Sequence, residues 1–188
     1  FLSLLLVPLF NFMAQQKMQQ ELLEGEEINQ RVLAGLSAYV KNNGRFPCPA
    51  RSDRAPNHVQ FGKEQAPCNS GAGNVVSGDI PVYDLKLPYH VMMNKEGWKY
   101  KYVVNKANTV VGQAANAGTI RVNDETGTAI VSTAPFIIIN MGKDGKGAYN
   151  INGDLNPRVE GATYNCNSLA AGGYGGAPLD AFNCDTND

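Results

Sequence analysis

Charged residues are scarce in this chain, and their signs nearly cancel. Only 18% of the 188 residues are Asp, Glu, Lys or Arg, and the formal net charge at pH 7 is −1. A strongly basic surface would be needed to attract a nucleic-acid backbone or an anionic membrane by charge alone. The composition gives no support to either kind of partner, and we predict that the chain does not bind nucleic acid.

Histidine is also rare, and the common catalytic motifs are missing. The two histidines, His58 and His90, both lie in loop-like surroundings and are too few for a histidine metal site. The sequence contains no G-x-S-x-G, H-E-x-x-H or phosphate-loop motif. The carboxylates fall mainly in expected loops or along an expected helix, without converging on one site. We therefore predict that the protein is not an enzyme and carries no cofactor.

One oxygen-rich segment is a weak candidate for calcium. It places side-chain oxygens at alternate positions, loosely like a calcium loop: Asn150, Asn152, Asp154, Asn156 and Glu160. Gly153 is in the wrong position for an EF-hand, and only two of these residues are charged. A turn held by its own Asn and Asp side chains explains the same pattern, so calcium at Asn150, Asn152 and Asp154 remains the lesser alternative.

No apolar run is long enough to cross a bilayer by itself. The run FLSLLLVPLFNFMA, residues 1–14, is shorter than the roughly 20 residues that a spanning helix needs. Pro8 lies inside it and removes one helical hydrogen bond. A polar but helix-forming stretch follows as far as Pro47-Cys48-Pro49. We predict one helix of about 35 to 40 residues, apolar in its N-terminal part and amphipathic in its C-terminal part.

The amphipathic part of the helix shows where the globular remainder of the chain, which we call the head, should pack. Ile28, Val32, Leu36 and Val40 recur four residues apart and predict a buried stripe over residues 25–43. Upstream of Gly25 no head remains to cover the helix, so residues 1–24 are predicted to form the membrane and filament-core segment. The residues expected to drive polymerisation are Phe1, Leu2, Leu4, Leu5, Leu6, Val7, Leu9, Phe10, Phe12 and Met13.

The remaining chain, with the amphipathic helix, is predicted to form one head over residues 25–188. A loop is expected over 44–90, an antiparallel sheet of three or four strands over 97–140, and a Gly- and Asn-rich loop region over 141–188. Within the sheet, residues 97–104 alternate in polarity, residues 119–132 suggest a hairpin, and the apolar run PFIIIN suggests a central strand. The fold class predicted is α+β.

The four cysteines form no C-x-x-C pair, which makes zinc and thiol-redox sites weak interpretations. Their spacing favours two local disulfides, Cys48–Cys68 and Cys166–Cys184, although the two other pairings and free buried thiols are alternatives. Disulfides would place the head outside the reducing cytoplasm.

Two local strings resemble a known family. LSAYVKNNGRFPCPA, residues 36–50, and IIINMGKDGKGAY, residues 137–149, are similar to the helix junction and to a strand and turn of a type IV pilin or pseudopilin subgroup. The resemblance implies a pilin-like fold, with one extended N-terminal helix and a small antiparallel sheet on its C-terminal half. It also implies a subunit that is exported across the inner membrane and polymerises through its helices.

Two features near the N-terminus depart from the family pattern. The family usually has Glu where this chain has Leu5, and its helical proline follows a full apolar crossing. If Pro8 is that proline, about 14 residues precede Phe1 in the mature subunit, which would complete a crossing of bilayer length.

These observations predict a structural subunit of an extracellular type IV pilus-like filament on the bacterial surface. Its partners would be copies of itself, the inner membrane before assembly, and a pilus or secretion assembly machinery. Two alternatives stay open. One is a pseudopilin of a type II secretion-like machine, and the other is a membrane-anchored binding protein that never polymerises.

Overall fold

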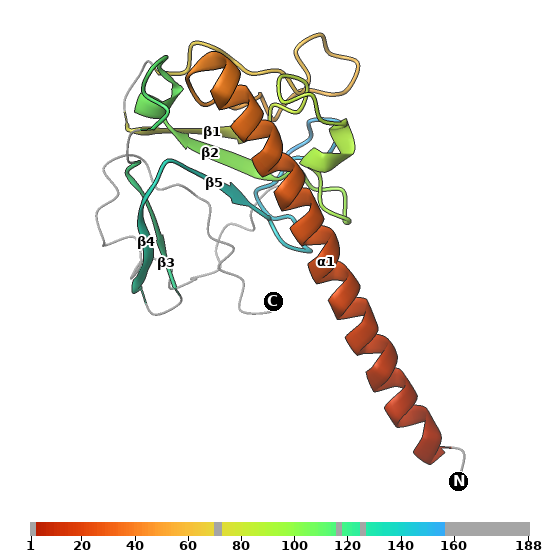
Figure 1. Cartoon of the computed structure of the whole chain (residues 1–188). Helices are drawn as coiled ribbons and strands as arrows, with labels where there is room; N and C mark the ends of the chain where they lie inside the picture. Colours follow the sequence, from red (N-terminus) through yellow and green to blue (C-terminus); the bar gives the residue numbers. More distant parts are fainter. Residues whose placement is uncertain (1–2, 70–72, 116–117, 125–126, 157–188) are drawn as a thin grey trace, which may run out of the picture.

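The computed structural model describes residues 3–69, 73–115, 118–124 and 127–156. Its regular elements, in chain order, are α1 (Ser3–Asn43), β1 (Val75–Asp79), the 3₁₀ helix η1 (Tyr89–Met92), β2 (Lys101–Asn105), the 3₁₀ helix η2 (Lys106–Thr109), β3 (Ile120–Asn123), β4 (Ala129–Ala134) and β5 (Phe136–Ile139). Figure 1 shows the C-terminal part of α1 lying beside the strands.

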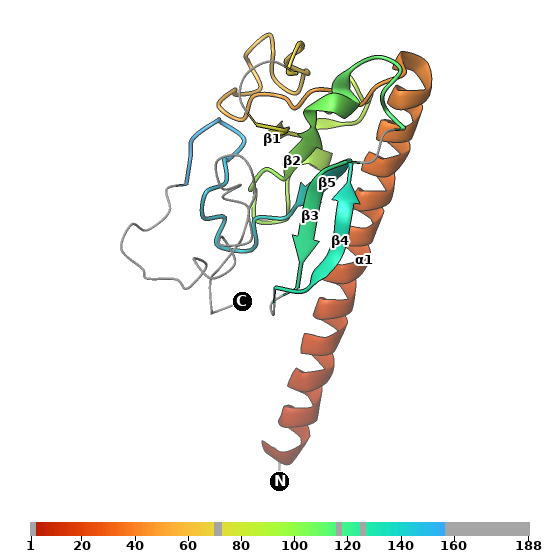
Figure 2. The same ribbon diagram turned by 90° about the vertical axis from the view of Figure 1, so that its left-hand side faces the viewer.

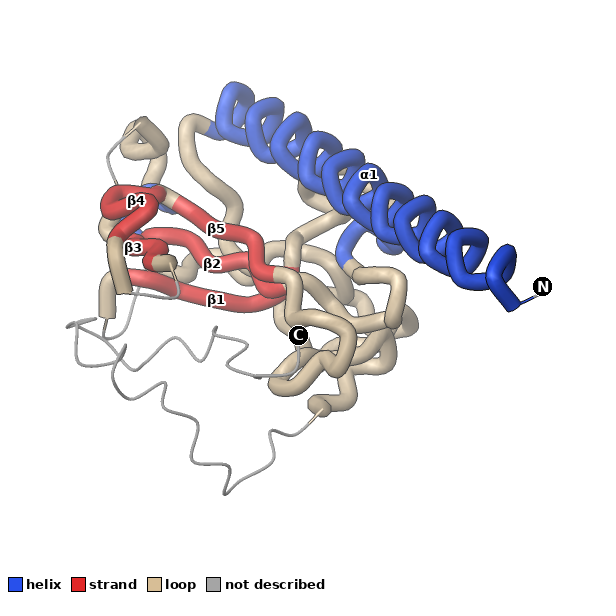
Figure 3. The backbone as a smooth tube through the Cα atoms, turned by 90° about the horizontal axis from the view of Figure 1, so that it is seen from below, coloured by secondary structure: helices blue, strands red, loops and turns tan. Residues whose placement is uncertain are grey.

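The five strands form two separate antiparallel sheets. The larger has the order β1-β2-β5, with Ser77 opposite Val103 and Tyr102 opposite Ile138. The smaller is the β3–β4 hairpin, which lies to one side of the larger sheet (Figure 1). Seen from below, α1 runs along one side of the three-stranded sheet (Figure 3).

Residues of α1 that recur at helical spacing build the core. Val32 is fully buried, and Leu36 and Tyr39 are almost so, whereas Val40 is only partly buried. They pack with sheet residues Tyr102 and Val104 in one cluster that also holds residues of the intervening segments: Phe61, Ile80, Val82, Leu85, Val91, Met92 and Tyr100. The predicted stripe is therefore correct at Val32 and Leu36, with Tyr39 taking the place expected for Val40.

The end of α1 follows from its local sequence. Gly44 adopts a positive φ of 68°, and its N–H donates to the carbonyl of Val40 at 2.8 Å. The amide of Asn43 donates to the carbonyl of Tyr39 at 2.9 Å, which satisfies a second group of the last turn. Glycine reaches this backbone conformation without steric cost, so the helix ends where Asn43 and Gly44 predict.

The predicted fold class, a type IV pilin-like fold with one long apolar N-terminal helix, is wrong. Side chains along α1 are described without gaps only over residues 25–43, a stretch of 19 residues, and a long apolar helix is not shown. Within the described residues, no helix combines the length and the apolar character that a membrane crossing requires. The strands also divide into two sheets, where one sheet of three or four strands was expected.

The sheet differs from the expectation in two further respects. The segment between Phe46 and Lys86, expected to be a connecting loop, contributes β1. The run PFIIIN forms β5, whose residues are half-buried, while β2 occupies the middle of the sheet. Only β2 is covered on both faces, because Tyr102, Val103 and Val104 are all fully buried. The central strand is thus β2, and not the run PFIIIN that was expected there.

Replacing Leu36 by alanine should lower the free energy of unfolding by about 2–5 kcal/mol, because it opens a cavity beneath the sheet. Leu33 on the same helix is 49% exposed, whereas Leu36 is 2% exposed. Leu33→Ala is the matched control and should cost less than about 1 kcal/mol. Urea denaturation of the two variants measures the difference. Equal losses would contradict the packing face assigned to α1.

Candidate functional site

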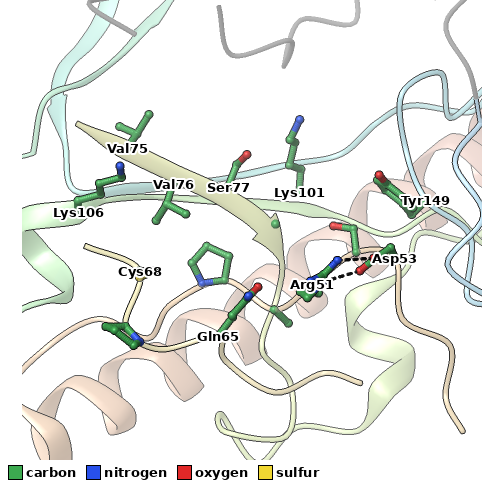
Figure 4. A pocket seen from close by; sticks show the side chains of 15 residues that line it. Arg51, Asp53, Gln65, Cys68, Val75, Val76, Ser77, Lys101, Lys106 and Tyr149 are labelled. Atoms are coloured by element: carbon green, nitrogen blue, oxygen red, sulfur yellow. Dashed lines mark hydrogen bonds and ion pairs between the residues drawn. The ribbon is translucent and has the colours of Figure 1, made fainter. Parts of the chain in front are cut away.

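A groove of about 750 Å³ opens beside β1 (Figure 4). One wall is the backbone and side chains of β1, and the other consists of residues 49–53 and 65–68, which flank the disulfide. Its polar lining includes Arg51, Asp53, Ser77, Lys101 and Tyr149.

The groove depends on a close approach between residue 50 and the end of β1. The N–H of Ala50 donates to the carbonyl of Asp79 at 3.0 Å, and the N–H of Asp79 donates back to Ala50 at 2.9 Å. A Cβ at Gly78 would collide with the carbonyl of Ala50, so only glycine permits this contact. The short sequence VVSGD therefore fixes one wall of the groove against the other.

Positive charge predominates along the groove. Arg51 holds Asp53 through two hydrogen bonds, from Nε at 2.8 Å and from Nη2 at 2.6 Å. The hydrogen bonds from Arg51 keep the pKa of the Asp53 carboxyl below its ordinary value. Lys101 and Lys106 also line the groove, across from Arg51 (Figure 4). The arrangement is suited to a polar or acidic group.

A second polar cluster, which we call the Glu64 network, joins α1 to the loop that carries the disulfide. Oε1 of Glu64 accepts hydrogen bonds from the hydroxyl of Tyr39 at 2.7 Å and from Nη2 of Arg45 at 2.7 Å. Oε2 accepts from Nη1 of Arg45 at 2.9 Å and from the N–H of Cys48 at 3.0 Å. The N–H of Glu64 itself donates to Asp84 at 2.5 Å.

The pKa values of two members of the Glu64 network, Glu64 and Tyr39, are shifted in opposite directions. Burial alone would raise the pKa of Glu64, but the hydrogen bonds from Arg45, Tyr39 and Cys48 outweigh it, and the pKa is lowered. Burial, and then the bond to Glu64, raise the pKa of Tyr39. Both shifts keep an ionised carboxylate and a neutral phenol at neutral pH, as this set of hydrogen bonds requires.

The predicted Cys48–Cys68 disulfide is confirmed, with the two Cα atoms 5.8 Å apart. Cys166 and Cys184 lie outside the described residues, so their pairing stays a prediction. The predicted polymerisation residues lie in the part of the N-terminal segment whose side chains are not described: Phe1, Leu2, Leu4, Leu5, Leu6, Val7, Leu9, Phe10, Phe12 and Met13.

The weak calcium candidate forms a turn that uses its own side-chain oxygens. Oδ1 of Asn150 accepts from the N–H of Asn152 at 2.9 Å and of Asp154 at 3.0 Å. The amide of Asn150 donates to Oδ2 of Asp154 at 3.1 Å. Among the described residues there is no group of three or more His, Cys, Asp or Glu side chains that could hold a metal ion. Calcium binding here stays a prediction, and Glu160 lies outside the described residues.

Sequence reasoning missed both the Glu64 network and the groove. Glu64 lies in a Pro- and Gly-rich segment that carries no periodic signal, and its partners lie up to 25 residues away. The one available sign was a carboxylate placed between two cysteines whose disulfide was expected. Nothing in the local sequence indicated that Arg45 and Tyr39 would reach it.

Comparison with known proteins identifies no relative for this chain. No family model matches it, and neither the curated proteins nor the solved structures yield a match. The groove and the Glu64 network therefore have to be interpreted from their own geometry.

Glu64→Gln should lower the free energy of unfolding at neutral pH by about 2 kcal/mol, because it leaves the part-buried Arg45 without its counter-charge. The folded-state pKa of Glu64 is lowered, so its contribution is fully present above the unfolded-state pKa and is lost as pH falls through the folded-state pKa. Urea denaturation should show the gap between wild type and variant closing as the solution becomes acidic.

The control for this experiment is Glu27→Gln. Glu27 pairs with Arg31 on the exposed side of α1, where the two side chains are 63% and 49% exposed. Exposed pairs of this kind contribute little, so the control should change stability by less than about 0.5 kcal/mol. If the difference in free energy of unfolding between wild type and Glu64→Gln did not depend on pH, the charge of Glu64 would not stabilise the contact between α1 and the disulfide loop.

Proposed function

We propose that this protein is a structural subunit that assembles with copies of itself into an extracellular, type IV pilus-like filament. Residues 1–24 supply the assembly contact, and the head forms the outer surface. The observation that carries this proposal is that the described side chains of α1 on the N-terminal side of Ile28 are exposed.

The exposure along α1 supports this division. Ile28 still packs partly against the core cluster. At Gly25 a Cβ would meet no atom within 4 Å, and Leu23 is 69% exposed. On its N-terminal side the backbone of α1 continues away from the sheets (Figures 1 and 2). A leucine left open at this place is available to a neighbouring molecule.

The N-terminal sequence gives assembly its driving force. Residues 1–14 are almost all apolar, and a soluble monomer rarely exposes an apolar surface of that size. Burying eight large side chains at about 1.5–3 kcal/mol each would yield on the order of 10–20 kcal/mol per subunit, before the entropic costs of association. Head-to-tail contacts between helically related copies bury such a surface and repeat without closing.

The disulfide supports an extracellular place for the head. Cys48–Cys68 encloses the loop that carries Glu64, and disulfides persist in oxidising compartments. Closing a loop of this length constrains the unfolded chain and stabilises the fold by about 3 kcal/mol. A head rich in loops would benefit from this constraint.

The groove beside β1 favours a second candidate, a binding protein anchored at the membrane that never polymerises. Arg51, Lys101 and Lys106 along one concavity provide a surface for a polar or acidic ligand. The two candidates differ in what residues 1–24 do: they join subunits in the first and only anchor the head in the second.

Electron microscopy of material sheared from the cell surface tests the first candidate. Fibres labelled by an antibody against this head should be present for the natural protein and absent for Leu6→Glu, which places a charge in the apolar segment. Glu27→Gln, on the exposed side of α1, is the control and should leave the fibres unchanged. A natural protein that appears only as monomers in detergent extracts would refute the filament and favour the anchored binding protein.

A further inference from the structure

A buried amino group meets a buried carboxyl group beside the groove. Nζ of Lys99 lies 3.1 Å from Oδ2 of Asp79, and the two side chains are 1% and 4% exposed. Asp79 ends β1 and pairs with Lys101, the first residue of β2. Lys99 lies two residues before Lys101. Its side chain therefore meets that of Asp79 diagonally across the two neighbouring segments.

The surroundings hold the amino group in one position and exclude water. Nζ donates hydrogen bonds to the carbonyl of Ser52 at 2.9 Å and to that of Arg54 at 3.0 Å. The ring of Phe61 lies beside it, with its centroid 5.3 Å from Nζ. The backbone N–H of Lys99 is held by the carbonyl of Tyr149 at 2.8 Å.

The carboxyl group is less well satisfied than the amine. Oδ2 of Asp79 is fully buried and receives no well-directed hydrogen bond, although Nζ lies close to it. Burial raises the pKa of Asp79, with the charge of Asp53 acting in the same direction, and outweighs the opposing effect of Lys99 and of the hydrogen bond with Ser52. A buried carboxyl oxygen that accepts no well-directed hydrogen bond requires an explanation, because such groups are rare and costly.

We propose that Lys99 and Asp79 condense into an intramolecular isopeptide bond. The reaction forms a bond between Nζ and Cγ of Asp79 and breaks the bond between Cγ and Oδ2. The leaving oxygen departs as water with two protons, one carried by the neutral carboxylic acid and one taken from the amine. No oxidant, reductant or other co-reactant is needed.

The hydrogen bonds prepare this reaction. Transfer of one proton from Nζ to Oδ2 yields a neutral pair, which a desolvated site tolerates better than two charges. The two protons left on Nζ keep their bonds to Ser52 and Arg54, so the lone pair faces Asp79. Nζ lies 3.1 Å from Oδ2, which is bonded directly to Cγ, so the amine is held next to the carbon that it attacks. The hydroxyl of Ser52, bonded to the Asp79 carboxyl, can stabilise the developing oxyanion.

The product resolves the features that are unfavourable in the unlinked pair. Both charges disappear from the interior, and the unsatisfied oxygen leaves the protein. The new amide N–H can still donate to one of the two carbonyls that now bind Nζ. The bond would tie the end of β1 to the start of β2, next to a loop that Cys48–Cys68 already closes.

Mass spectrometry of the full chain tests this proposal directly. After reduction of the disulfides and complete denaturation, the protein should weigh one water molecule less than its sequence requires. Trypsin should fail to cut after Lys99 and should release a branched peptide joining residues 64–86 to residues 96–101. Finding the separate, unlinked peptides together with the full mass would refute the proposal.

Variants distinguish the isopeptide from other losses of water, such as a cyclic imide at an aspartate. Lys99→Arg keeps the positive charge but lacks the primary amine, and Asp79→Ala removes the carboxyl, so both should restore the full mass. Lys101→Arg, at the half-buried position two residues further on, should still lack one water. A loss of water that persists in Lys99→Arg would overturn the assignment. The branched peptide in the natural protein decides the matter even where a variant does not fold.

Discussion

The carboxylate of Glu64 is the interaction on which the rest of the head depends. It accepts hydrogen bonds from the last part of α1, from the junction that follows and from the first cysteine of the disulfide. These three segments have no regular hydrogen-bond pattern that would fix them to one another. One part-buried carboxylate with four hydrogen bonds therefore replaces a ladder of backbone hydrogen bonds, and its removal would leave unsatisfied donors in all three segments.

A head built in this way can contain long irregular segments. The chain from Arg45 to Ile80 crosses the end of α1, closes a disulfide and returns as the edge strand β1. Its backbone is fixed at a few points, at Ala50 against Asp79 and at Glu64 against Asp84. Between these points the segment lines the groove. Because few hydrogen bonds hold the segment against β1, space is left beside the strand.

The sequence predicted what depends on near neighbours. Helical spacing identified Val32 and Leu36, and cysteine spacing identified Cys48–Cys68. The amphipathic part predicted over residues 25–43 ends where α1 ends. It failed where partners are distant. In strand β1, Gly78 is needed because the carbonyl of Ala50 approaches it too closely for a side chain. Glu64 binds Tyr39 and Arg45, which are distant in the sequence. The fold class was wrong because the short apolar run over residues 1–14 and the resemblance in two local strings were extended to a long apolar helix that is not shown.

The two faces of the larger sheet have different surroundings. Tyr102 and Val104 face α1 in the core cluster, whereas Ser77 pairs with Val103 on the opposite side of the pleat and opens into the groove. Side chains alternate between the two faces of a strand. A substitution at Ser77 therefore alters the face of the sheet that lies away from α1. A contact made along α1 therefore leaves the groove open, and a subunit held by its N-terminal segment would still present the groove to a ligand.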